Sequence, residues 1–384
     1  MRYSRLLALV ALASMSAVAS GQASAAKGDK GGGADAKSKQ QKPKKDKSQP
    51  LTPEEIESAK RRTERLFGAD DPIEFTLAAD FKQLFKSRDT LNVKTVKGTL
   101  TLKDSAGNPL DIPVELSPRG HFRLRSDVCN FPPIRLIFPS QGLKGTPFAG
   151  QKALKLGTHC QQRDKEFSEY PVREYGAYKV LNMLTDWSFK ARLARVNYVP
   201  VGNEKDAFTK LGLLIEDESD MAKRNGGRIY TVRGGTFSDV DPAQIAIVSV
   251  FAYFLGNTDW SLYSLHNIRL VATSDGRYVP VPYDFDWSGV VFARYAKPDP
   301  RLGIPTVQDR LFRGPCMTPA DLAPVIAKFN ANKAAIKDLY AKLPVDDGYR
   351  RRAMDYYDDF FRVIGDQRQV KRELIETCVG RATS

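Results

Sequence analysis

Histidine and cysteine are scarce in this 384-residue chain, and their scarcity excludes several kinds of site. The three histidines are scattered and no Cys-x-x-Cys spacing occurs, so the patterns that hold structural zinc are missing. The shortage also makes a two-metal phosphoester hydrolase the least favoured phosphate chemistry, because such sites usually collect more His and Asp ligands. No zinc-finger or RNA-motif pattern is present, and we therefore expect no nucleic-acid partner.

Long apolar runs are scarce as well. The N-terminal run covers residues 6–19 and is shorter than the roughly 20 residues that a membrane span needs. Arg2 and Arg5 precede it, and the small residues 23–25 offer a cleavage site, so residues 1–25 are predicted to be a signal peptide and not an anchor. The sequence thus predicts a secreted or periplasmic protein with no transmembrane segment after signal cleavage.

Positive charge, by contrast, is in excess, with a formal net charge of +14. Residues 26–50 contribute eight lysines against three aspartates, a run of three glycines and almost nothing that could enter a core. This composition is typical of a disordered tail. Outside the cytoplasm such a tail either contacts an anionic surface, such as lipid, lipopolysaccharide or cell-wall polymer, or serves as a solvated spacer, and we favour the spacer.

The four cysteines are an even number in a chain predicted to reach an oxidising compartment, which favours disulfides. Four cysteines allow three connectivities, so the sequence leaves the choice open. Nearness along the chain favours the pairs Cys129 with Cys160 and Cys316 with Cys378.

The first part of the region after the tail is predicted to consist mainly of strands. Thr52 as a cap and Pro53 in the first turn predict a leading helix that runs to about Phe67. Apolar residues at helical spacing predict one principal helix over residues 172–184. Short apolar runs predict a mostly antiparallel sheet, with strands at residues 75–79, 97–102, 112–116, 121–124, 134–138, 152–156, 196–201 and 211–216.

The second part is dominated by predicted helices. We expect an α+β protein with a strand-rich N-terminal lobe over residues 51–240 and a helix-rich C-terminal lobe over residues 241–384. The C-terminal lobe would carry a catalytic-like loop and an Asp-Phe-Asp motif on either side of a hairpin. Helical periodicity is found at residues 242–255, 319–339, 347–364 and 367–379, and the hairpin at residues 268–272 and 278–281.

Oxygen-bearing side chains stand on both sides of this hairpin. Asp259 and Asn267 precede it, and Asp284 and Asp286 follow it. Magnesium usually takes one or two protein carboxylates plus substrate phosphates, so Asn267, Asp284 and Asp286 are candidate metal ligands. Asp259 would then accept the proton of an attacking hydroxyl, as phosphoryl transfer requires. The alternative is that these are turn residues, since Asn and Asp often bond their own backbone in loops.

Phosphate charge also needs cations, and the strand-rich part offers candidates. Lys155 and Arg135 alternate with apolar neighbours on predicted strands and so project to the opposite face. Arg119 and Arg123 lie near another strand start, and Glu216 at a strand end would orient such a cation. The same alternation also describes any half-exposed strand, so the assignment stays open.

Three segments around the hairpin resemble motifs of a known family. Asn257-Thr258-Asp259, His266-Asn267 and residues 282–286 are similar to the paired motifs of the spore-coat protein H (CotH) kinase family. The resemblance implies an atypical protein-kinase-like fold of two lobes, with ATP as phosphoryl donor and Mg²⁺ or Mn²⁺ as the metal. It also implies that Asp259 occupies the catalytic-loop position and Asp284 the metal-binding one.

The favoured function is therefore an exported, metal-dependent phosphotransferase that moves a phosphoryl group from a nucleotide to a hydroxyl of a protein or envelope molecule. The alternative is a catalytically inactive, kinase-like binding protein of the cell envelope. The first predicts that nucleotide with metal stabilises the protein, whereas the second predicts no response to nucleotide.

Overall fold

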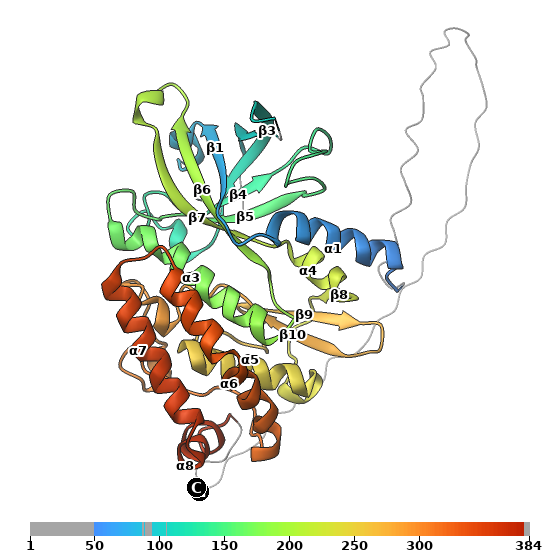
Figure 1. Cartoon of the computed structure of the whole chain (residues 1–384), viewed down its shortest axis with the longest axis vertical. Coiled ribbons are helices and arrows are strands. Elements are labelled where there is room, and N and C mark those ends of the chain that lie inside the picture. Colours follow the sequence, from blue (N-terminus) through green and yellow to red (C-terminus); the bar gives the residue numbers. More distant parts are fainter. Residues whose placement is uncertain (1–49, 87, 89–93, 105, 380–384) are drawn as a thin grey trace, which may run out of the picture. The chain divides into compact units, whose positions relative to one another are not determined.

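The computed structural model of the chain describes residues 50–86, 88, 94–104 and 106–379 (Figure 1). The predicted signal peptide, residues 1–25, lies outside the described residues. The predicted tail, residues 26–50, lies outside them too except for Pro50.

Seven strands form a closed barrel. The barrel order is β1-β2-β3-β4-β5-β7-β6, and β6 returns to pair with β1. All neighbours are antiparallel except β1 and β6, which are parallel. Its strands are β1 (Ile73–Ala79), β2 (Val96–Lys103), β3 (Pro109–Pro118), β4 (Ile134–Ile137), β5 (Ala153–Gly157), β6 (Ala191–Pro200) and β7 (Phe208–Ile215).

The barrel interior is filled by side chains that alternate along each strand, as period-2 patterning requires. Leu77, Leu100, Leu136 and Leu214 belong to one cluster of buried apolar residues there. The predicted strands are therefore present and mostly antiparallel, with one exception. Residues 121–124 were predicted as a strand, but residues Phe122–Leu124 form a 3₁₀ turn after Gly120, whose φ of 98° ends the extended backbone.

The prediction of a kinase-like fold with two lobes is wrong, because the strands close on themselves. The mixture of strands and helices makes the protein α+β, but a closed barrel is not a kinase-like lobe. The closing pair is parallel and joins Ile73 to Ala194. A parallel pair has no connecting hairpin, so no turn signal in the sequence announces it.

A second, three-stranded sheet has the order β10-β9-β8. The hairpin of β9 (Ile268–Thr273) and β10 (Tyr278–Pro282) agrees with the prediction. The third strand, β8 (Gly227–Tyr230), pairs with β9 and was not predicted. It is too short to show a clear alternation in the sequence.

The helices mostly agree with their predicted ranges. Thr52 and Glu55 form a capping box at the start of the first helix, as the sequence indicates. The last predicted helix, residues 367–379, is shorter, because α8 ends at Val370 and a π-helical turn over Lys371–Ile375 follows. The helices are α1 (Pro53–Phe67), α2 (Phe81–Leu84), α3 (Lys165–Leu184), α4 (Glu218–Arg224), α5 (Pro242–Leu255), α6 (Pro319–Lys342), α7 (Asp347–Ile364) and α8 (Gln367–Val370).

Helix α3 connects the barrel with the helices. It contacts β6 and β7 on the barrel side and α5 and α6 on the other, so most of its residues are buried (Figure 1). Helix α1 lies against α4 and β6. No helix in the described part of the chain is long and apolar enough to cross a bilayer.

Both favoured disulfide pairings are confirmed. Cys129 is bonded to Cys160, and Cys316 is bonded to Cys378. The first bond ties the segment after the Phe122–Leu124 turn to the chain that leaves β5, and the second ties the segment before α6 to the last described residues. Two disulfides are compatible with an extracellular protein, because such bonds persist mainly in oxidising compartments.

Candidate functional site

Most of the predicted site residues line one cleft of about 1020 Å³, here called the Asp284 cleft. The segment 117–124 and strands β4 and β5 form one side of it, and the chain from Asp259 to Trp287 forms the other. Of the residues singled out in the sequence, the cleft is lined by Asp259, Asn267, Asp284, Asp286, Arg119, Arg123, Arg135 and Lys155, while Glu216 is not among its lining residues.

The loop that carries Asp259 follows from how α5 ends. Gly256 stops the helix with a φ of 65°, and a Cβ at this position would lie 2.1 Å from the Tyr356 hydroxyl. Asn257 Oδ1 then accepts a hydrogen bond from the Asp259 backbone N–H at 2.9 Å. An antiparallel bridge between Ser261 and His266 folds the chain back on itself. Asp259 is thereby brought beside Asn267, although eight positions separate them.

Both oxygens of Asp259 are hydrogen-bonded. The Oδ2 atom accepts from Asn267 Nδ2 at 2.9 Å, and Oδ1 lies 3.0 Å from His266 Nε2. The bond to Asp259 raises the pKa of His266. Because the Asn267 nitrogen is turned toward Asp259, its carbonyl oxygen is left as the atom that could face a cation. His266 was left out of the predicted site, since a single loop histidine has no distinguishing pattern.

Backbone strain is concentrated at this cleft. Leu265, Asn267 and Asp284 have φ values of 53°, 51° and 63°, in the left-handed region that side chains disfavour. Only two other non-glycine residues in the described part of the chain, Cys160 and Phe292, share this conformation. Strained residues of this kind often cluster at functional sites, where the surrounding structure holds them in place.

A buried arginine lies among three carboxylates at the base of the cleft. The guanidinium of Arg123 is 3.3 Å from Asp284 Oδ1, 3.4 Å from Asp286 Oδ2 and 4.0 Å from Glu174 Oε2. Tyr295 donates a hydrogen bond to Asp286 at 2.8 Å. Burial raises the pKa of both Glu174 and Asp286, and the charge of Arg123 opposes the shift. We call these four charged residues the Arg123 cluster.

Glu174 is a member of this cluster that the sequence does not reveal. It lies in the middle of α3, which is buried on nearly every side. A carboxylate within a buried helix requires a partner. The sequence would point to Glu174 as a paired acid only if it also showed that this part of α3 is buried.

The cations of the cleft project from the outer face of the barrel. Arg135 and Lys155 are register partners on β4 and β5, so they point to the same side, while Leu154 and Leu156 enter the barrel core. Burial, followed by the nearby charge of Arg119, lowers the pKa of Lys155 to about 8. Its Nζ atom lies 5.0 Å from the ring centre of Tyr283.

Glu216 belongs to a different contact network. Its carboxylate accepts from Arg224 Nε at 2.8 Å and from Thr63 Oγ1 at 2.5 Å, so it links α1, α4 and the end of β7. The structure therefore does not place it where it could orient Lys155 or Arg135. Glu218 is the acid that pairs with a cation of the cleft, since its carboxylate lies 2.7 Å from Arg269 Nε.

The donor set fits a hard divalent ion only in part. No three His, Cys, Asp or Glu residues within the described ranges are arranged to hold a metal ion. Asp286 is engaged by Arg123 and Tyr295, whereas the Asp284 side chain is 31% exposed and faces the cleft. Magnesium needs only one or two protein ligands when phosphates supply the rest. Asp284 and the carbonyl oxygen of Asn267 are the atoms that fit this requirement.

No family model matches the chain, and no curated protein matches its sequence.

Proposed function

We propose that the protein is a metal-dependent phosphotransferase that moves a phosphoryl group from a nucleotide to a hydroxyl of a protein or envelope molecule. The observation that supports this proposal is that oxygen donors and cations line one cleft. We call Asp259, Asn267 and Asp284 its oxygen-bearing wall, and Arg119, Arg135 and Lys155 its cationic wall; Arg233 and Arg269 also line the cleft. Transfer of a phosphoryl group depends mainly on positioning and on charge stabilisation of this kind.

The cationic wall would bind the phosphates of the donor. Arg135 and Lys155 project side by side from adjacent strands, and Arg119 lies within reach of both along the cleft lining. Lys155 is still protonated at neutral pH, because its pKa is about 8. A bound phosphate would raise that pKa again, since an opposite charge favours the protonated amine.

The oxygen-bearing wall would activate the acceptor. Asp259 is 34% exposed on its side chain and held by His266 and Asn267, so its orientation is fixed before an acceptor arrives. It would take the proton from the acceptor hydroxyl. Asp284 and Asn267 would hold Mg²⁺ or Mn²⁺, and the ion would neutralise phosphate charge.

Export from the cytoplasm is part of the proposal. It rests on the signal-peptide pattern of residues 1–25 and agrees with the two disulfides. The acceptor would then be a hydroxyl of an exported protein or of an envelope molecule.

A thermal-shift titration with ATP and Mg²⁺ or Mn²⁺ tests the proposal. A ligand at about 100 times its Kd stabilises the folded state by roughly 2.7 kcal/mol, so the melting temperature should rise measurably. Asp284→Asn should remove the metal-dependent part of the rise, and Asp259→Asn should leave binding intact but abolish transfer of labelled phosphate to an acceptor. Asp275→Asn, in the exposed β9–β10 turn, is the matched control and should behave like the wild type.

One observation favours the alternative of a binding protein without catalysis. Arg123 already occupies the position between Asp284, Asp286 and Glu174 that a cation would take, and it pairs with them without any metal. If neither ATP nor a divalent ion, alone or together, changes the melting temperature, the phosphotransferase proposal fails and this alternative stands.

A further inference from the structure

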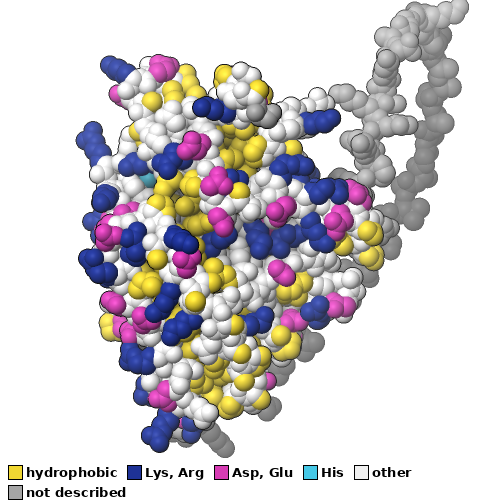
Figure 2. Space-filling model, viewed as in Figure 1, with side chains coloured by type: hydrophobic (Ala, Val, Ile, Leu, Met, Phe, Trp, Pro, Cys, Tyr) yellow, Lys and Arg dark blue, Asp and Glu magenta, His cyan; other side chains and the backbone are white. Residues whose placement is uncertain are grey.

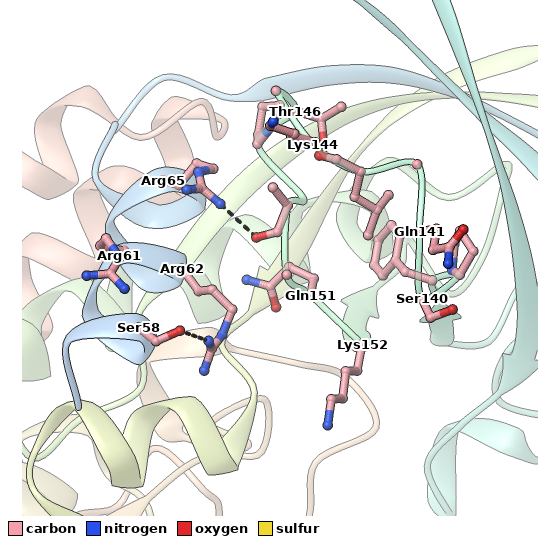
Figure 3. A pocket seen from close by; sticks show the side chains of 18 residues that line it. Ser58, Arg61, Arg62, Arg65, Ser140, Gln141, Lys144, Thr146, Gln151 and Lys152 are labelled. Carbon is pink, nitrogen blue, oxygen red and sulfur yellow. Dashed lines mark hydrogen bonds between the residues drawn. The ribbon is translucent and has the colours of Figure 1, made fainter. Parts of the chain in front are cut away.

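A second pocket, also of about 1020 Å³, lies between α1 and the connection from Phe138 to Lys152, which joins β4 to β5. We call it the α1 pocket. It shares no lining residue with the Asp284 cleft. Arginines project from α1 on one side, and lysine and glutamine side chains face them from the connection (Figure 3). Lys and Arg side chains gather on the surface where α1 lies (Figure 2).

The lining of the α1 pocket is basic without any compensating acid. Five of its lining side chains are Lys or Arg and none is Asp or Glu. Two of the five are neutralised from outside the pocket, since Arg61 pairs with Glu54 and Arg62 with Asp220, each at 2.6 Å. Arg65, Lys144 and Lys152 have no carboxylate partner among the described residues. Three positive charges therefore face this hollow unpaired.

The pocket also contains an amide that is open to solvent. Gln151 is 4% exposed as a residue, and its side-chain atoms are not among the buried polar atoms that lack a partner in the described part of the chain. It is turned toward Arg62, into the space between α1 and the connection (Figure 3). Its amide is therefore available as a hydrogen-bond donor and acceptor to a group that enters the pocket.

The connection is held in place by its own contacts. Thr146 is buried and its hydroxyl donates to the Leu143 carbonyl at 2.8 Å. Gly150 has a φ of 85°, and a Cβ there would lie 2.7 Å from Arg62 Cδ, so only glycine lets the connection approach α1 this closely. Arg65 donates to the Ala149 carbonyl at 2.8 Å from the same helix. The cations are thus presented by a pocket that exists before a ligand arrives.

We propose that the α1 pocket binds a chain carrying closely spaced phosphate groups, such as an oligophosphate or a phosphate-bearing polymer. Phosphates concentrate negative charge and accept hydrogen bonds from arginine, lysine and amide donors at once, which matches Arg65, Lys144, Lys152 and Gln151. A flat bilayer would meet the exposed lysines but could not reach an amide as buried as Gln151. The ligand must therefore enter the hollow as a thin chain.

The probe for this proposal is inorganic tripolyphosphate, titrated calorimetrically into the whole chain. The triple variant Arg65→Gln, Lys144→Gln and Lys152→Gln should weaken binding at least about tenfold, because each charge-assisted bond contributes roughly 1.5–3 kcal/mol. Gln151→Leu should weaken it about threefold or more with no change in charge. The matched control removes three exposed lysines elsewhere, through Lys97→Gln, Lys103→Gln and Lys205→Gln, and should bind within about twofold of the wild type.

Two further arms separate the α1 pocket from other anion sites. Because the Asp284 cleft carries cations of its own, the titration is repeated in the background Lys155→Gln, where the weakening caused by Gln151→Leu should persist. Anionic phospholipid vesicles should bind without dependence on Gln151. Equal weakening by the triple variant and the control, loss of the Gln151 dependence in the Lys155→Gln background, or vesicle binding that depends on Gln151 would each overturn the proposal.

Discussion

Replacing Arg123 by methionine would test the Arg123 cluster directly. The arginine side chain is 10% exposed and lies within 4.0 Å of three carboxylates, of which Glu174 and Asp286 are buried. Methionine is long, flexible and uncharged, so Arg123→Met removes the charge with little loss of packing. The substitution leaves three acids without their shared cation.

The expected loss of stability follows from that arrangement. Removing one partner of a buried ion pair costs about 3–5 kcal/mol, because an uncompensated charge stays behind. Asp284 is 31% exposed and Tyr295 still donates to Asp286, so we expect the lower end, about 3 kcal/mol at slightly alkaline pH. In a domain of this size that corresponds to a fall in melting temperature of about 4 °C.

The loss should depend on pH in a defined direction. Burial already raises the pKa of Asp286 to about 6 and that of Glu174 to about 8, and removal of Arg123 would raise both further. An acid whose pKa is higher in the folded state than in the unfolded state holds protons that the unfolded chain has released. Stability is therefore present at low pH and is lost as pH rises through the folded-state pKa values. The variant should be closest to the wild type near pH 5, and its deficit in stability should grow as pH rises through the wild-type pKa values of about 6 and 8 and beyond them.

Thermal melts followed by circular dichroism across this pH range are the assay. Arg125→Met is the matched control, because Arg125 is exposed and its contacts are with Asp127 and the face of Phe122 and not with the three acids of the cluster, so its melting temperature should change little. Mg²⁺ or Mn²⁺ should stabilise Arg123→Met more than the wild type, since the vacated carboxylates can accept an ion. The reasoning would be refuted by a variant that melts within about a degree of the wild type near pH 8. It would also be refuted by a variant whose melting temperature falls equally near pH 5 and near pH 8.

Two other predictions concern the barrel and its disulfide. Burial lowers the pKa of His159 to about 3, and neither ring nitrogen has a hydrogen-bond partner among the described residues. Below about pH 6.5 the imidazole is therefore protonated in the unfolded chain but stays neutral in the folded protein. Stability should fall by up to about 1.4 kcal/mol per pH unit as pH drops from there, and His159→Phe, beside Phe131, should flatten this slope in melts at successive pH values. Replacing both Cys129 and Cys160 by serine should cost about 2–5 kcal/mol in urea unfolding, and a reducing agent should then destabilise the variant less than the wild type; equal loss in both would contradict this.

Local signals in the sequence account well for single elements. The range of α1 follows from Thr52, Pro53 and Glu55, and that of α5 from Pro242 and Gly256, because caps and turn residues act on the neighbouring backbone. The disulfide partners agree with the pairs that nearness along the chain favours, although the count of cysteines alone leaves three connectivities open. The grouping of Asp259, Asn267 and Asp284 around one hairpin could also be expected, since a hairpin brings its two ends together.

Two errors have a common cause. The segment with Arg123 was predicted as a strand because charged and apolar residues alternate there, but it forms a tight turn that directs the arginine into the Arg123 cluster. Glu216 was expected beside Lys155, but it meets Arg224 and Thr63 instead. In both cases the pattern indicates which residues alternate and does not indicate which distant side chains face them.

The amino-acid order alone thus set the limits of helices such as α1 and α5, most strands and the position of the acids near one hairpin, since these depend on neighbours a few residues apart. Folding in three dimensions decided the rest. Closure of the barrel joins β1 to β6, Glu174 reaches Arg123 from another helix, and α1 meets the connection from Phe138 to Lys152. Each of these contacts joins segments distant in the chain, where burial and pairing energies act without leaving a local trace.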